Sequence, residues 1–490
     1  MNLFILILYF LSMSLIMIFS LVQFDLSLRY IKRKKGIPDK PLPEPDPAAY
    51  PLITVQLPIY NEKYVVRRLL EAVVSLDYPA DKFEIQVLDD STDETTSIIQ
   101  DFMRNPGRKD INITWFHRDN RDGYKAGAML EGLKKAEGEF VAIFDADFIP
   151  KRDFFKKTIP YFKDSQIGLV QTRWGHINEN YSLLTKLQAF GLNAHFTVEQ
   201  VGRSSAGSFI NFNGTAGIWR KKCILESGNW DTDMLSEDLD LSYRAQLKGW
   251  KFIYLESVVA PAELPVVIQA IRSQQFRWTK GGAETARKTL GDVLKSQLRW
   301  TNKIHAIFHL LNSTVFPLLL LAAITSIPML LIKDMRPEYR LFFNLGSIFL
   351  VGFLGISVFY WVAAKYNHPS HSLKYYLLNF PLFLTLNMGL SFQNSIAVLE
   401  GLFGVKTPFI RTPKFNIYKQ NDPLNDTIYI KSKISWQHIV EFFLFLYFLS
   451  GVGMGIYLGD FGLLIFHFML AAGFAGVFYY SLKPNVSKNR

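Results

Sequence analysis

Cysteine is almost missing from this chain of 490 residues, in which Cys223 is the only one. One cysteine cannot form an intrachain disulfide, so a reducing compartment is permitted. The glycine motifs of the common nucleotide-binding folds are missing too, because no G-x-G-x-x-G follows an expected strand and no G-x-x-x-x-G-K-S/T occurs. A nucleotide bound by this chain would therefore be held in another way.

Charge is missing from one long stretch near the start of the chain. Residues 3–22 are apolar without interruption, long enough for a bilayer core of about 30 Å, and the basic run "RYIKRKK" follows at once. The charges lie after the apolar run and no small-x-small cleavage site follows it, which disfavours a cleaved signal peptide. We expect a membrane helix in residues 1–28, with its C-terminal end in the cytoplasm, and a basic, Pro-rich linker at 29–50.

Long apolar runs return in the second half of the chain. They cover residues 304–332, 341–364, 375–399, 438–458 and 461–482. Hydrophobic residues make up 49% of the chain, which fits a multi-pass integral membrane protein. The net charge of +11 is spread over segments beside these runs, so we interpret it as positive-inside topology and contact with membrane lipids, not as nucleic-acid binding.

Residues 51–262 have the pattern of one large soluble domain. Short apolar runs that read as strands alternate with helical patterns; the expected strands are "ITVQLP", "FEIQVLDD", "NITWFH" and "EFVAIFDAD". The helices between them are expected in "NEKYVVRRLLEAVVSL", "STDETTSIIQDFM" and "GYKAGAMLEGLKKA". This order predicts an α/β domain with a parallel sheet covered on both faces, whose ligands bind at the carboxyl ends of the strands.

Polar clusters follow three of these strands: "YNE" at 60–62, "DD" at 89–90 and "DAD" at 145–147. Asp145 and Asp147 can face one cleft if the chain turns there, and carboxylate oxygens suit Mg²⁺ or Mn²⁺, which would hold a diphosphate. Alone, an Asp-x-Asp pair would be interpreted as solvated turn acids. The neighbouring acids, and Lys125 as a cation for phosphate, favour a nucleotide site.

A third acidic group opens the helical pattern "SEDLDLSYRAQLKGW". Ser236 is placed as an N-cap, with Glu237 and Asp238 in the first turn, where the helix dipole favours anions. Simple capping charges would explain one of these two acids. The same dipole would keep a carboxylate ionised, as a general base toward a sugar hydroxyl requires, and the pattern leaves both interpretations open.

A helix through "LPVVIQAIRSQQFRW" would place Gln274, Arg277 and Trp278 at i, i+3 and i+4, on one face. It lies just before the apolar runs, so an ordinary interfacial anchor is the plain alternative. The following "TARKTLGDVLKSQLRW" has apolar and basic residues at helical spacing, so a second interfacial helix is expected within 263–303.

Together and in this order, these motifs resemble a membrane-embedded family 2 glycosyltransferase of the cellulose-synthase and mannan-synthase type. The matching stretches are "YNE", "DDSTD", "GYKAGA", "DAD", "FNGTAG", "SEDLDLSYRAQLKGW" and Q-x-x-R-W at 274–278, within about residues 50 to 290. The resemblance is strongest to the mannan-synthase-like branch, through "FTVEQ", "FNGTAGIWR" and "LKGWKF". It implies a GT-A (Rossmann-like) domain inserted between an N-terminal transmembrane helix and a C-terminal α-helical transmembrane bundle.

The resemblance also implies roles for single residues. Trp278 would be the acceptor platform, with Asn213 and Gly214 beside it; Arg277 would pair with the donor diphosphate and Gln274 would bond sugar or backbone nearby. Asp145 and Asp147 would hold the metal, and Asp238, with Glu237, would be the catalytic base. The remaining contacts to the nucleotide sugar would come from Tyr60, Glu62, Asp89, Asp90, Lys125 and Lys414.

Residues 408–415, "PFIRTPKF", resemble the F-x-V-T-x-K segment with which cellulose synthases close over bound nucleotide. Phe409, Thr412 and Lys414 fit that pattern, whereas Arg411 stands where Val is expected and Pro413 has entered. A gating loop at 400–437 must be cytoplasmic, which a full crossing by 375–399 would prevent. The polar "LNMGLSFQN" in that run therefore suggests a broken, re-entrant or interfacial helix within the 304–399 membrane region, ahead of a final hairpin and tail at 438–490.

The sequence thus predicts a processive, inverting hexosyltransferase of the membrane, with a cytoplasmic catalytic domain, that polymerises a β-linked glycan from GDP-mannose or UDP-glucose with Mg²⁺ or Mn²⁺. One alternative is a non-processive enzyme that adds a single sugar to a lipid such as ceramide. Another is a transporter or receptor with an inactive domain, against which the intact acids argue. Whether the chain forms a homo-oligomer stays open.

Overall fold

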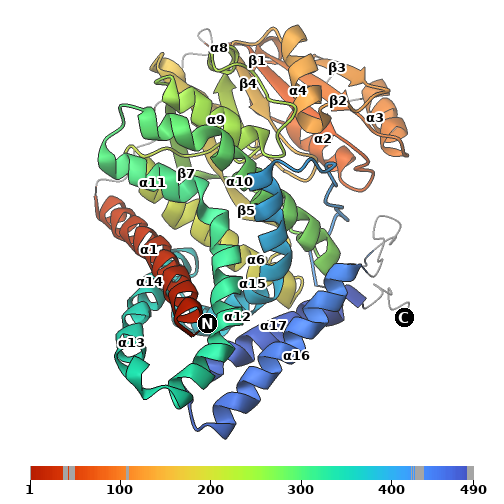
Figure 1. Cartoon of the computed structure of the whole chain (residues 1–490). Helices are drawn as coiled ribbons and strands as arrows, with labels where there is room; N and C mark the ends of the chain where they lie inside the picture. Colours follow the sequence, from red (N-terminus) through yellow and green to blue (C-terminus); the bar gives the residue numbers. More distant parts are fainter. Residues whose placement is uncertain are drawn as a thin grey trace.

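The computed structural model describes residues 2–36, 50–105, 110–420 and 435–482, together with residues 42, 107, 422 and 424. Most of the linker expected at 29–50, part of the expected gating loop and the tail from 483 lie outside the described residues. Figure 1 shows two parts, a sheet domain at the top of the view and long helices below it.

Among the described residues, the sheet domain contains seven strands in the order β3-β2-β1-β4-β6-β5-β7. Strands β3, β2, β1 and β4 are parallel, as predicted, whereas β6 runs antiparallel to both β4 and β5, so the sheet is mixed. The central strands β1, β2 and β4 are largely buried; every residue of β2 is buried, including Glu84 and Gln86, which bond to polar side chains of β1. The bounds are β1 Ile53–Ile59, β2 Phe83–Asp89, β3 Asn112–His117, β4 Phe140–Ile143, β5 Ile167–His176, β6 Gly217–Arg220 and β7 Lys251–Ala262.

Helices cover both faces of this sheet. In α2, the buried side chains are Val66, Leu69, Leu70, Val73 and Val74, the spacing of one apolar helix face. The other helices of the domain are α3 Thr95–Arg104, α4 Tyr124–Lys135, α5 Phe154–Thr158, α6 Leu183–Ala194, α7 Gln200–Ser205, α8 Lys221–Glu226 and α9 Glu237–Leu247, and α2 itself is Val66–Val74. A π-helical turn, His195–Glu199, joins α6 to α7.

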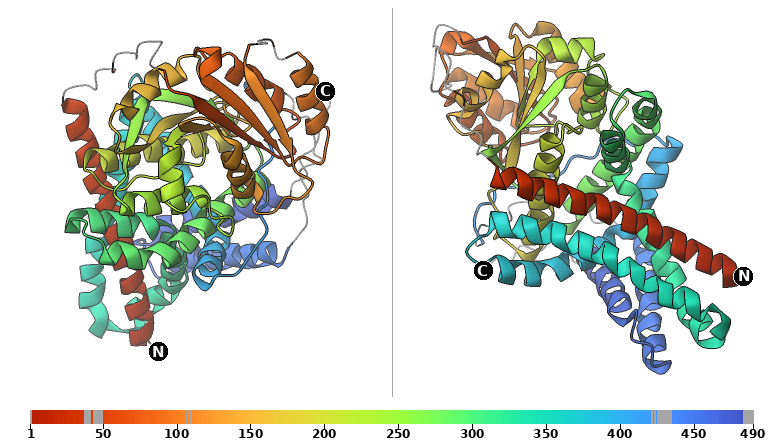
Figure 2. Two further views of the ribbon diagram at one scale, coloured as in Figure 1. Left: turned by 90° about the horizontal axis from the view of Figure 1, so that it is seen from above. Right: turned by 90° about the vertical axis from the view of Figure 1, so that its left-hand side faces the viewer.

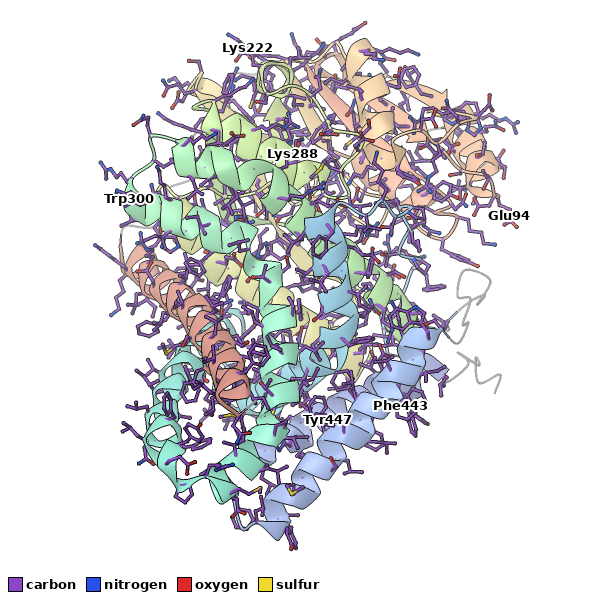
Figure 3. The ribbon with its side chains drawn as sticks, in the orientation of Figure 1. Glu94, Lys222, Lys288, Trp300, Phe443 and Tyr447 are labelled. Carbon is purple, nitrogen blue, oxygen red and sulfur yellow. The ribbon has the colours of Figure 1, made fainter. Side chains whose placement is uncertain are left out.

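Six helical stretches among the described residues are long and apolar enough to cross a membrane. They are α1 Asn2–Lys35, Asn312–Met335 with α12 Val315–Met335, Pro337–Asn367 with α13 Arg340–Leu345 and α14 Phe349–Asn367, α15 Ser372–Phe403, α16 Trp436–Tyr457 and α17 Leu464–Leu482. Figure 2 shows α1 running beside α14. In Figure 3, Phe443 and Tyr447 project from α16, far from Lys222 and Glu94 on the outside of the sheet domain, so apolar and charged surfaces are separated.

Three expectations for the helices were wrong in detail. The second interfacial helix is not separate, because α10 runs unbroken from Ile268 to Lys295. The run 304–332 is divided: α11, Trp300–Leu310, packs on the sheet domain, where the His305 carbonyl accepts a hydrogen bond from Arg203 at 2.8 Å. Of the broken, re-entrant or interfacial helix expected at 375–399, the broken form is wrong, because α15 is one continuous helix.

Helix α15 contacts the sheet domain or its covering helix at both ends. Near its start, the Tyr375 hydroxyl donates to Glu179 at 3.0 Å, and near its end Glu400 pairs with Lys280 of α10 at 2.9 Å. Several of its polar side chains bond within the protein; Gln393, for example, donates to the Arg272 carbonyl at 2.7 Å, whereas the buried Asn394 amide has no partner among the described residues. An interfacial path for α15 therefore agrees with these contacts, and a break does not.

Candidate active site

A cavity of about 210 Å³ opens at the carboxyl ends of β1, β2 and β4, where the strand order predicts a ligand. Helix α10 and the segment 405–418 complete its walls. It is lined by all but one of the residues predicted to form the site: Tyr60, Glu62, Asp90, Lys125, Asp145, Asp147, Asn213, Gly214, Glu237, Asp238, Gln274, Arg277, Trp278 and Lys414.

Asp89 is the exception, because it is fully buried behind the cavity wall. Its carboxylate accepts from the Ser91 amide at 2.9 Å, the Thr96 hydroxyl at 2.9 Å and the Trp115 indole at 3.2 Å. This geometry does not support the predicted contact of Asp89 with the nucleoside; Asp89 fixes the loop that presents Asp90. Asp90 in turn pairs with both arms of the Arg118 guanidinium, at 2.7 and 2.5 Å.

The two acids of the D-x-D pattern both face the cavity, and each pairs with a lysine. Lys125 Nζ lies 2.5 Å from Asp145, and Lys414 Nζ lies 2.5 Å from Asp147. No group of three acidic, His or Cys side chains in the described part of the chain could hold a metal by itself. Two carboxylates completed by phosphate oxygens and water are, however, the donor set that Mg²⁺ commonly takes in phosphate sites, so these residues fit a divalent cation.

Glu237 and Asp238 lie in the first turn of α9, as predicted, and both line the cavity. Burial raises the pKa of both carboxyls; repulsion between them adds to this for Glu237, and the Lys125 ammonium opposes it. Gly214, with φ of +79°, brings its backbone so close that an added Cβ would lie 3.1 Å from Asp238 Oδ2. The raised pKa suits a group that must take up a proton near neutral pH.

Helix α10 presents Gln274, Arg277 and Trp278 to the same cavity, which confirms that they share one face. Ser236 occupies the N-cap position of α9, but its side chain makes no capping bond. Instead it packs against Gly281, where an added Cβ would lie 2.1 Å from Ser236 Oγ. The absence of a side chain at 281 therefore lets α10 reach the end of α9 and brings Arg277 and Trp278 to the acids.

The segment 405–418 lies across the cavity. The Phe409 ring stacks on Tyr124 with centroids 5.7 Å apart, and Lys414 reaches Asp147. Arg411, which departs from the cellulose-synthase pattern, makes a two-armed pair with Glu62 at 2.9 and 2.7 Å. The segment is thus positioned for the gating role that the resemblance implies.

Several lining residues were not predicted from the sequence. The Arg121 guanidinium carbon lies over the Tyr60 ring, 3.3 Å from its centroid, and Glu263 accepts from the amides of Phe415 and Asn416 at 2.8 and 3.0 Å. Trp174 and His176 of β5 also line the cavity. Arg411 also lines the cavity, and the sequence drew attention to it only as a mismatch to the F-x-V-T-x-K pattern. The motifs found in the sequence include none of the other four lining residues, which are Arg121, Trp174, His176 and Glu263.

Comparison with known proteins agrees with this geometry. Residues 51–281 match the model of a family described as "Glycosyltransferase like family 2". This part of the chain is a family 2 glycosyltransferase domain. The matched residues 51–281 include all the predicted site residues except Lys414.

Two relatives are glucomannan 4-beta-mannosyltransferases. Glucomannan 4-beta-mannosyltransferase 1 of Oryza sativa subsp. japonica is 41% identical over 317 residues, which are 61% of this chain and 60% of that relative. Glucomannan 4-beta-mannosyltransferase 9 of Arabidopsis thaliana is 43% identical over 284 residues, which are 56% of this chain and 53% of that relative. The chain thus spans a little over half the length of the curated relatives it matches. Over the aligned part, the chain is similar to glycosyltransferases of the mannan-synthase type.

A solved structure shares the fold. The mannosyltransferase PcManGT from Pyrobaculum calidifontis, in complex with GDP-Man and Mn2+, aligns with 82% of this chain and 100% of its own, with a TM-score of 0.55 and 19% sequence identity. This likeness confirms the GT-A fold.

Proposed function

We propose that this chain is a processive, inverting membrane glycosyltransferase that polymerises a β-linked, mannan-type polysaccharide. One observation carries the proposal: Trp278 and Arg277 of α10 line the same cavity as Asp238 and the Asp145/Asp147 pair. An indole face suits the C–H face of a pyranose, and a guanidinium offers paired donors to phosphate. A platform for an acceptor sugar and a site for a nucleotide diphosphate therefore meet at one carboxylate.

The donor we propose is GDP-mannose. The glucomannan 4-beta-mannosyltransferases that are 41% and 43% identical to this chain transfer mannose, according to their names, which supports this donor. UDP-glucose is the competing donor within the wider family.

The chemistry follows from where the side chains lie. Asp145 and Asp147 would hold Mg²⁺ or Mn²⁺, which when bound neutralises charge on the leaving diphosphate. Arg277 and Lys125 bind the diphosphate oxygens, and Trp278 orients the acceptor sugar. Asp238 takes the proton from the acceptor hydroxyl as that oxygen attacks the anomeric carbon from the face opposite the diphosphate, so the configuration inverts.

The sheet domain is proposed to face the cytoplasm, where nucleotide sugars are made available to it. The basic end of α1, with Lys32, Arg33, Lys34 and Lys35 in its last turn, supports this orientation. Because α15 contacts the domain at both ends, the segment 405–418 stays on the same side as the cavity. A growing glycan would leave the cavity toward the membrane helices. An enzyme that adds one sugar to a lipid would instead need an opening through which the lipid enters from the membrane.

A panel of radiolabelled nucleotide sugars tests the proposal. Membranes containing the chain should transfer label from GDP-mannose to a glycan, in a metal-dependent reaction, and should leave UDP-glucose largely unused. Label in a lipid carrying one sugar would support the non-processive alternative, and no transfer from any donor would support an inactive domain.

A further inference from the structure

One wall of the cavity carries buried polar atoms without a partner. Trp174 Nε1, His176 Nε2 and Asn213 Nδ2 make no hydrogen bond to any described residue, although all three side chains line the cavity. Proteins pair nearly all of their buried polar atoms, because an unpaired one costs about 1–3 kcal/mol. Three such atoms on one wall indicate a polar ligand there.

The protein holds these groups in fixed orientations. Asn213 Oδ1 accepts from Asn211 at 2.9 Å and Gln200 at 3.2 Å and lies 3.3 Å from the His195 ring nitrogen, which leaves the amide NH₂ unpaired. The Trp174 ring packs edge-on against Phe148 at 5.1 Å and against Phe196 at 4.8 Å. Residues His195 and Phe196 begin the π-helical turn, a feature that often marks functional sites.

His176 adds a neutral ring to the wall. Burial lowers its pKa to about 3, with the nearby Arg173 charge acting in the same direction and a hydrogen bond to Asn193 opposing it. At physiological pH the ring is uncharged, and Nε2 can donate or accept according to its tautomer. Two N–H donors beside an adaptable ring nitrogen match hydroxyl groups, each of which both donates and accepts, better than they match a phosphate.

The wall lies on the acceptor side of the cavity. Strand β5 is three positions from β1 in the sheet, so at about 4.8 Å per strand its end lies roughly 14 Å from Tyr60 and the donor residues there. Asn213, by contrast, directly precedes Gly214, whose backbone meets Asp238. Leu192, Leu264 and Pro265 supply apolar surface beside the polar atoms.

We propose that Trp174, His176 and Asn213 form a subsite for a further sugar of the glycan acceptor, beyond the sugar that stacks on Trp278. The proposal rests on the proposed function, and it adds Trp174 and His176 as residues that determine how the acceptor binds. It implies that the preferred acceptor is an oligosaccharide and not a single sugar.

Binding of defined sugars tests this subsite without depending on catalysis. Calorimetry would measure the affinity of the purified full chain for β-1,4-linked manno-oligosaccharides of one to six sugars and, separately, for GDP. In the parent, affinity should rise with length until the wall is covered. Trp174→Phe, which keeps the packed ring, and His176→Phe should each weaken binding of the longer sugars about 2- to 12-fold, the range for one hydrogen bond, with GDP binding unchanged.

Trp230→Phe is the matched control. The Trp230 indole nitrogen is also buried and unpaired, but its ring packs against Phe212 and Trp219 and does not line the cavity. The subsite would be overturned if Trp174→Phe and His176→Phe bound the longer sugars with the same affinity as this control. It would also be overturned if the parent bound no oligosaccharide, or if the variants lost affinity for GDP instead of affinity for the sugars. Sugar binding as expected in a chain that transfers no mannose would overturn the proposed function and leave the subsite standing.

Discussion

The pair of Arg411 and Glu62 holds the segment 405–418 across the cavity, and removing it should open the segment. Both side chains are only 12% exposed, and the guanidinium reaches both carboxylate oxygens. In Arg411→Ala, the closed state keeps the Glu62 carboxylate buried without its partner. The open state, in which water reaches the carboxylate, does not have this cost.

The structure allows an estimate of the effect. Removing one partner of a buried ion pair costs about 3–5 kcal/mol. Glu62 can offset part of that cost by taking up a proton, because burial already raises the pKa of its carboxyl. About 2–3 kcal/mol remains, which would increase the open fraction roughly 30- to 150-fold.

Hydrogen exchange would measure this opening directly. In the closed segment the amides of Phe415 and Asn416 donate to Glu263, so they exchange only when the segment opens. Mass spectrometry of peptides that cover 405–418 should show exchange accelerated by the same factor in Arg411→Ala. Arg411→Lys, which keeps the charge but loses the two-armed geometry, should fall between that variant and the parent.

Arg67→Ala is the matched control, because Arg67 pairs with Glu71 on the solvent side, where both side chains are about 60% exposed. Such a pair contributes about 0–1 kcal/mol, so exchange in 405–418 should stay near that of the parent. If Arg411→Ala also exchanged within twofold of the parent, the buried pair would not hold the segment closed and the estimate would be refuted.

Three further predictions concern the reaction itself. Asp238→Asn should abolish transfer and leave GDP affinity nearly intact, and equal losses of rate and affinity would give Asp238 another role. In the parent, the transfer rate should fall as the pH decreases through the raised pKa of the Glu237/Asp238 pair, because the base must be ionised. Gly281→Ala should reduce the transfer rate at least about tenfold by pushing α10 away from Ser236. Gly282→Ala, whose added Cβ would meet only one atom, at 3.7 Å, should transfer at the rate of the parent, and equal rates in the two variants would refute the importance of the close approach. Asp147→Ala should remove the effect of Mn²⁺ on donor binding in a metal titration, and a parent-like titration would place the metal elsewhere.

The sequence predicted the donor half of the fold well, because strong local patterns specify it. The strands β1, β2 and β3 match the predicted runs closely, since each is rich in β-branched or aromatic residues that alternate with polar ones. The antiparallel β6 was not predicted, because its four residues, Gly217–Arg220, are too short to show a period. Pairing between distant strands depends on tertiary contacts that local periodicity does not report.

The errors in the helices have similar causes. The polar residues of α15 suggested a break, but several of them bond back within the helix, as Asn387 does to the Phe383 carbonyl at 2.8 Å, and Gln393 bonds to α10. The adjacent glycines Gly281 and Gly282 do not end α10, and the close contact with Ser236 requires the first of them. A single sequence does not reveal which polar or glycine residues are satisfied in this way.

The candidate site was predictable where motifs exist and hidden where only geometry joins the residues. All predicted site residues except Asp89 line one cavity, although they come from stretches as distant as 60–62 and 414. Trp174 and His176 look like ordinary strand residues, and only the folded β5 brings them to the wall. The partner of Glu62 likewise became known only from the structure.

The account as a whole depends on whether the chain extends a glycan, and the size of the product tests that claim most directly. Purified chain in lipid nanodiscs would be given labelled GDP-mannose, and the products of the parent and of Trp278→Ala would be sized by mass spectrometry. The parent should make long polymer, and the variant, which loses the acceptor platform, should make shorter chains while donor hydrolysis to water changes little. A single sugar on a lipid from both proteins would contradict the account.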